Sequence, residues 1–140
     1  MNPSTTSRPS LALLLAAIVA VHTAIGLWHG AAHVHVPVPL TGLQQAFIGV
    51  IIVLLPVVGA CLLWSRWRLT AAWLITLAML ASLIFGLLNH FVLDSVDNVV
   101  SVPEHEWRHG FVFSAAMVAV SETAGTAIGA VAIWLWGRRT

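Results

Sequence analysis

The sequence predicts an all-α integral membrane protein: a four-helix bundle that runs up-down-up-down, with both termini in the cytoplasm. Of the 140 residues, 59% are hydrophobic and only 8% are charged, and a soluble domain needs more charge to cover its surface. Four apolar stretches are each about as long as a membrane-spanning helix, roughly twenty residues. We expect the whole chain, residues 1–140, to form a single domain.

The charges between these stretches set the predicted orientation. Arginine is enriched on the cytoplasmic side of membrane proteins, and here five of the six arginines lie at alternate connections or ends. These five are Arg8, Arg66, Arg68, Arg138 and Arg139. The opposite ends carry the remaining arginine, Arg108, with most of the acidic residues and every histidine except His22. The sequence therefore predicts a histidine-rich outer face.

The first span is expected at residues 11–30. A helix of that length covers about 30 Å, the thickness of the hydrocarbon core. The segment also has the length of a signal-peptide core, but the best cleavage site, after Ala24, places His22 at the upstream specificity position. A retained helix is therefore the interpretation. Pro37 and Pro39 forbid further helix and predict an extended outer loop over residues 33–40.

The second and third spans are expected at residues 43–64 and 69–91. Pro56 removes a backbone hydrogen bond inside the second span and should kink it, which is tolerated when a neighbour satisfies the freed carbonyl. The short basic connection at residues 65–68 requires the two spans to be antiparallel neighbours.

The fourth span is expected at residues 108–136. The segment Ser101-Val102-Pro103-Glu104 has the pattern of a helix capping box with proline just inside the helix start. The helix is therefore predicted to begin above the membrane, near Pro103. Glycines or other small residues four apart occur in three of the four spans and favour close helix packing.

His22 and Glu122 are candidate functional residues because ionisable groups inside a membrane are costly and usually face the interior of a bundle. Counting at the usual helical rise of about 1.5 Å per residue places both near the middle of the membrane. They are predicted to form a buried polar pair. The pair would serve either as a proton relay or as a structural hydrogen-bonded contact.

The histidines of the first span form a second candidate group. His22, His29 and His33 fall on one helical face, and His29 and His33 are one turn apart, a spacing that lets two imidazoles reach one metal ion. An alternative places His33 and His35 on one side of an extended segment. The two arrangements exclude each other.

The opposite connection supplies further candidates. His90 ends the third span, Asp94 follows it, and His105 and His109 are four residues apart at the predicted start of the fourth span. The string His105-Glu106-Trp107-Arg108-His109 matches a zinc-protease pattern, although a chance match in a histidine-rich chain is the simpler explanation. The predicted metal ligands are His29, His33, His90, His105, His109 and Asp94.

Imidazole suits zinc, copper, nickel and haem iron. The cofactor is unknown from the sequence, with a transition metal or haem b as the candidates; a haem would need two facing axial histidines, such as His29 with His90 or with His109. Two other interpretations of the outer histidines stay open: a pH sensor and a hydrogen-bonded interfacial collar.

The favoured function is that of a small membrane subunit or accessory protein with a histidine-rich outer face, and the alternative is a protein that binds a transition metal or haem b. The pattern does not favour an enzyme. The expected location is the cell membrane, as a multi-pass protein of a prokaryotic inner membrane. The expected partners are the lipid bilayer and either a membrane protein or further copies of the chain. No basic cluster suggests nucleic acid.

Overall fold

In the computed structural model, which describes residues 7–138, every regular element is a helix and no strand occurs among those residues. Two of the elements are π-helices, in which hydrogen bonds join residues five apart. The elements are α1 (Ser7–His35), α2 (Gly42–Phe47), η1 (Ile48–Leu54), α3 (Leu55–Leu62), α4 (Arg68–Leu87), η2 (Leu88–Val92) and α5 (Arg108–Gly137).

These elements form four helices that are long and apolar enough to cross a membrane: Ser10–His35, Gly42–Leu62, Arg68–Val92 and Arg108–Gly137. The predicted class, all-helical with four helices able to span a membrane, is confirmed, and each predicted span overlaps one of these helices. Because such apolar lengths are typical of transmembrane segments, the four helices indicate a membrane protein.

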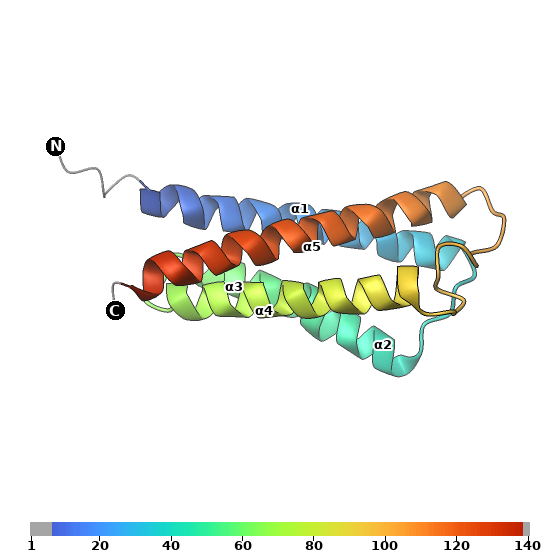
Figure 1. Ribbon diagram of the computed structural model, residues 1–140, viewed down its shortest axis with the longest axis horizontal. Coiled ribbons are helices and arrows are strands. Elements are labelled where there is room, and N and C mark those ends of the chain that lie inside the picture. The colour runs from blue at the N-terminus through green and yellow to red at the C-terminus, as the bar shows by residue number, and fades with distance from the viewer. Residues whose placement is uncertain (1–6, 139–140) are drawn as a thin grey trace.

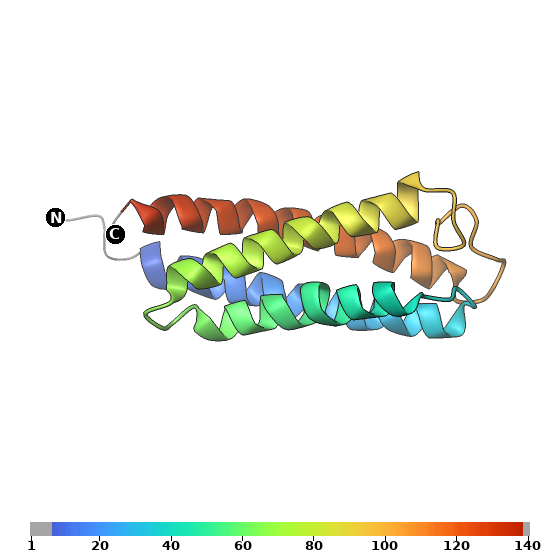
Figure 2. The same cartoon turned by 90° about the horizontal axis from the view of Figure 1, so that it is seen from below.

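The four helices lie side by side, and successive helices run in opposite directions (Figures 1 and 2). The start of α1, the α3–α4 turn and the end of α5 lie at one end of the molecule, which we call the arginine end because Arg66, Arg68 and Arg138 are there. The α1–α2 and η2–α5 connections lie at the other, the loop end. Which end faces the cytoplasm stays a prediction.

Two predicted boundaries were wrong. Residues 33–35 belong to α1 and not to an extended loop. A proline disfavours helical geometry at the residue before it, and the first proline here is Pro37, so the helix can continue to His35. The fourth helix begins at Arg108 and not near Pro103. Residues 93–107 instead form turns in which Val102 is buried and its carbonyl accepts from Arg108 Nε at 3.2 Å.

The segment around Pro56 contains a run of π-helical turns in η1, immediately before the proline. Pro56 has no N–H, so the carbonyl of Ile52, four residues earlier, has no α-helical donor. His22 Nε2, from α1, lies 3.4 Å from that oxygen. A neighbouring helix thus supplies the partner that the proline removes.

The arginine end contains the tightest packing. A core that includes Leu15, Ile75, Met79 and Trp136 joins α1, α4 and α5. At Gly129 the helices α4 and α5 approach so closely that a Cβ atom would overlap Thr76. The helices α4 and α5 are therefore in close contact toward this end, and the histidines described next lie toward the loop end.

Candidate metal centre

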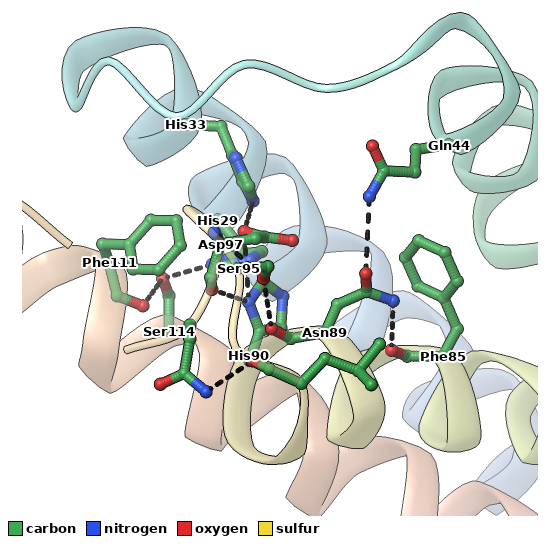
Figure 3. A network of polar contacts seen from close by, with 12 residues as sticks. His29, His33, Gln44, Phe85, Asn89, His90, Ser95, Asp97, Phe111 and Ser114 are labelled. Atoms are coloured by element: carbon green, nitrogen blue, oxygen red, sulfur yellow. Dashed lines mark hydrogen bonds and ion pairs between the residues drawn. The ribbon is translucent and has the colours of Figure 1, made fainter. Parts of the chain in front are cut away.

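Three histidines from two helices meet near the loop end of the bundle (Figure 3). His29 and His33 are one turn apart on α1, and His90 lies in η2 at the end of the third span. One ring nitrogen from each lies within 4.8 Å of the others. His29 and His90 are buried and His33 is partly buried. We call His29, His33 and His90 the histidine cluster.

The π-helical turn and the connection after it help to shape the cluster. The main-chain N–H of Leu93 donates to the carbonyl of Leu88, which closes the last π turn around His90. The connection then folds back, because the N–H of Val99 donates to the His90 carbonyl at 2.9 Å. This return brings Asp97 against the cluster. Single π-helical turns of this kind are frequent at functional sites.

The contacts of His90 fix which of its nitrogens carries the proton. Nδ1 lies 3.0 Å from the main-chain oxygen of Asp97 and 3.3 Å from its Oδ1. Both atoms are acceptors, so Nδ1 must be the donor. In the neutral ring Nε2 is then unprotonated, with its lone pair available.

His29 of α1 makes a similar contact, with Ser114 of α5. The hydroxyl of Ser114 donates to the Phe111 carbonyl at 3.0 Å, which leaves the serine oxygen ready to accept from His29 Nδ1 at 2.9 Å. Nε2 of His29 is then also unprotonated. The two Nε2 atoms, of His29 and His90, face each other at 3.2 Å. Two lone pairs at this separation repel each other unless a cation or a proton lies between them.

His33 adds a third nitrogen. Its Nε2 lies 3.5 Å from Asp97 Oδ1, which favours a proton on that atom. Its Nδ1 is buried and has no hydrogen-bond partner among the described residues. His29 and His90 therefore each have one nitrogen directed to an oxygen atom and a second, Nε2, that is available to a ligand.

Asp97, which was not among the predicted ligands, is the carboxylate of this site. It is 4% exposed, whereas the predicted Asp94 is exposed. Burial raises the pKa of the Asp97 carboxyl, but the contact with His90 and positive charge on His90 and His33 outweigh burial and lower the pKa below its usual value. Asp97 and Asp94 are both loop aspartates, and the sequence alone offered no periodicity by which to choose between them.

The structure does not bring His105 and His109 to the cluster. Both are exposed, and His105 lies before α5, where its Nδ1 accepts from the Trp107 N–H at 3.1 Å. The expected helical pair is absent because the helix starts three residues after His105. Glu104 and Arg108 form an ion pair, at 3.4 Å.

His22 and Glu122 are both buried, at 1% exposure each, but their hydrogen bonds go to other residues. His22 Nδ1 lies 3.1 Å from Ser121 Oγ, and Glu122 Oε1 accepts from the Ser82 hydroxyl of α4. The reason is helical geometry: Ser121 and Glu122 are adjacent on α5 and point about 100° apart, so they face different helices.

Haem b does not fit the histidine cluster. A porphyrin would have to lie between two axial nitrogens, but the Nε2 atoms of His29 and His90 are already 3.2 Å apart. The ring of Phe111 also packs against both imidazoles, with centroid distances of 5.0 Å and 5.6 Å. The other predicted axial partner, His109, is exposed.

Comparison with known proteins adds no functional assignment to this geometry. No protein-family model matches the chain, and neither a curated protein nor a solved structure matches it.

Proposed function

We propose that this protein is a membrane protein that binds a divalent transition-metal ion, with Zn²⁺ as the first candidate, at the histidine cluster. The observation that carries the proposal is the pair of Nε2 atoms of His29 and His90, which face each other at 3.2 Å while their Nδ1 atoms contact oxygen atoms. Two nitrogens bound to one tetrahedral zinc ion lie about 3.3 Å apart, because each Zn–N bond is about 2.0–2.1 Å.

The surroundings support a metal ion more than an isolated hydrogen bond. Metal-binding histidines commonly direct their second nitrogen to a carboxylate or carbonyl, which orients the ring. Asp97 does this for His90 through both its main-chain and its carboxylate oxygen. In this proposal His29, His33 and His90 are the protein ligands, and Asp97 and Ser114 are positioning residues.

In the cell, the proposed site belongs to a small subunit or accessory protein of a prokaryotic inner membrane. The arginine distribution supports an orientation in which the loop end faces away from the cytoplasm. The cluster would then bind metal from the outer compartment. The partner, whether another membrane protein or a second copy, is part of the proposal, and native mass spectrometry in detergent measures it directly.

The test is metal binding by the purified protein. After treatment with EDTA and dialysis, the parent should bind one Zn²⁺ per chain in an isothermal titration, and Co²⁺ at the same site should show the visible spectrum of a tetrahedral nitrogen-rich complex. His29→Ala and His90→Ala should each abolish this binding. Far-ultraviolet circular dichroism checks that the helices of both variants persist.

His105→Ala and His109→Ala are the matched controls, because both are exposed histidines at the same end but outside the cluster. They should bind zinc like the parent. A parent protein that retains no metal at any stoichiometry would overturn the proposal and leave a shared proton between His29 and His90. Equal losses in the controls would show that zinc binds to exposed imidazoles instead.

A further inference from the structure

A cavity of about 380 Å³ extends from the histidine cluster toward the centre of the bundle. Small residues on three helices create this space, because Gly26 and Gly30 of α1, Gly86 of α4, and Ala115 and Ala119 of α5 all line it. Apolar side chains of several elements line the rest of the cavity, among them Ile48 and Ile52 of η1. The cavity is therefore mainly apolar, with polar groups at particular points.

The cavity has an accessible side between α1 and the second span. The α2 segment diverges from the rest of the bundle toward the loop end (Figure 1). Val34 of α1 and Val53 of η1, which both line the cavity, are 82% and 37% exposed. In a membrane this opening faces the lipid, so an apolar molecule could enter sideways from the bilayer.

Glu122 supplies an unsatisfied polar group inside the cavity. The residue is 1% exposed, and its Oε1 accepts from Ser82, but its Oε2 has no hydrogen-bond partner among the described residues. A Cβ atom on Gly86 would lie 3.9 Å from Oε2 and 4.0 Å from His90 Cδ2, so the free space over Gly86 faces both groups. A buried carboxylate without a partner is costly unless a donor or a cation joins it.

We propose that this cavity binds a membrane-soluble amine, with its protonated nitrogen at Glu122 Oε2 and its apolar body against Ile48, Ile52 and the small residues. Two acidic side chains line the cavity, Glu122 and Asp97, and both favour a cation. A neutral alcohol can donate a hydrogen bond to Oε2, but it brings no charge to pair with a carboxylate there. The proposal does not require a metal ion in the cluster.

Equilibrium dialysis of EDTA-treated protein in detergent, with empty micelles as the blank, tests this at neutral pH. The probes share one apolar body: 4-phenylbutylamine, 4-phenyl-1-butanol and 4-phenylbutanoate. The amine should bind saturably with one molecule per chain, the alcohol roughly tenfold or more weakly, and the acid should not bind. Glu122→Gln should weaken amine binding by about tenfold or more, because it removes one partner of a buried charge pair. Equal binding of amine and alcohol, or no effect of Glu122→Gln, would overturn the proposal.

Gly86→Leu and Gly49→Leu form the second pair of variants. Gly86 lines the cavity, and its first added carbon meets nothing closer than 3.9 Å, so leucine should fill the space and abolish amine binding. Gly49 lies in the second span outside the cavity lining, with nothing within 4 Å, so its leucine variant should bind like the parent. Zinc titration of Gly86→Leu separates the two proposals. Loss of amine binding with intact zinc binding would locate the amine in the cavity. Retained amine binding would contradict that location.

Discussion

His22 is a buried polar residue of a membrane-spanning helix, and both of its ring nitrogens lie near oxygen atoms of other helices. With the proton on Nε2, the ring donates to the Ile52 carbonyl that Pro56 leaves without its α-helical donor. Nδ1 then accepts from the Ser121 hydroxyl, 3.1 Å away, when that hydroxyl turns from the Val118 carbonyl, which lies 2.8 Å from the same oxygen. One imidazole thus joins α1, η1 and α5. This arrangement assigns His22 a structural role and explains how the second span accommodates its proline.

We expect His22→Leu to lower the free energy of unfolding by about 1–3 kcal/mol, because a buried carbonyl loses its donor. In a Pro56→Ala background the alanine N–H can donate to the Ile52 carbonyl, so His22→Leu should lower the free energy of unfolding by less. Unfolding in a detergent titration, followed by circular dichroism, measures all four proteins of this double-mutant cycle. Additive effects would contradict the link between His22 and Pro56.

Asp97 is the residue whose role depends most on the metal proposal. Its main-chain oxygen and its carboxylate both contact His90 Nδ1, at 3.0 Å and 3.3 Å. Asp97→Asn should weaken zinc binding by about 10–100-fold, the usual effect of removing the partner of a metal-binding histidine. Zinc titration of this variant beside Asp94→Asn, which changes an exposed aspartate of the same connection, makes the comparison. Equal affinities in the two variants would remove Asp97 from the site.

The candidate site shows which residues a sequence can identify. His29 and His33 were predictable because helical periodicity alone places them one turn apart. His90 was identified from its place at the end of a span. Asp97 was not identified, because a turn after the helix decides which aspartate points inward. His105 was placed on a helix, but the start of α5 depends on how Val102 packs. Contacts within one helix could therefore be predicted from the sequence, and contacts made by irregular segments could not.

At the scale of elements, the π-helical segments are the main departure from the predicted fold. All four spans follow from apolar length, but η1 and η2 have no clear sequence signature beyond the nearby proline of η1. Each lies at a buried histidine: Ile52 of η1 contacts His22, and η2 contains His90. A hydrogen bond across five residues changes the direction of the side chains that follow, which periodicity does not reveal.

The packing of α4 on α5 gives a prediction at the same scale. A Cβ atom on Gly129 would overlap Thr76, which is held in place by a 2.7 Å hydrogen bond from its hydroxyl to the Ala72 carbonyl. A Cβ atom on Gly125 would overlap Met79, whose flexible thioether end can move. Gly129→Ala should therefore destabilise the bundle by about 1–3 kcal/mol, and Gly125→Ala by less.

Detergent unfolding of the two variants measures this difference, with Gly26→Ala as the control because nothing lies within 4 Å of its added carbon. The control should unfold like the parent. A Gly125→Ala variant that is less stable than Gly129→Ala would contradict the assignment of Thr76 as the rigid neighbour.

For the whole molecule, the two ends of the bundle differ in chemistry. The arginine end contains a core of packed apolar side chains, and Arg138 lies over the Trp134 ring at 3.9 Å. The loop end contains the histidine cluster, and the cavity extends from the cluster toward the centre of the bundle. The histidine cluster therefore lies nearer to one side of the membrane than to the other. Its proposed function therefore depends on which side that is.

The arginine distribution predicts that the loop end faces outward, and the single cysteine makes this testable. In a Cys61→Ser background, Val100→Cys places the only thiol at a loop position that is 82% exposed in the parent. A membrane-impermeant maleimide should label this variant in intact cells. Ser65→Cys, at the exposed α3–α4 turn, should be labelled only after the membrane is opened. The reverse labelling pattern would reject the predicted orientation while leaving the fold unchanged. It would place the histidine cluster on the cytoplasmic side, where the proposed zinc ion would come from the cytosol.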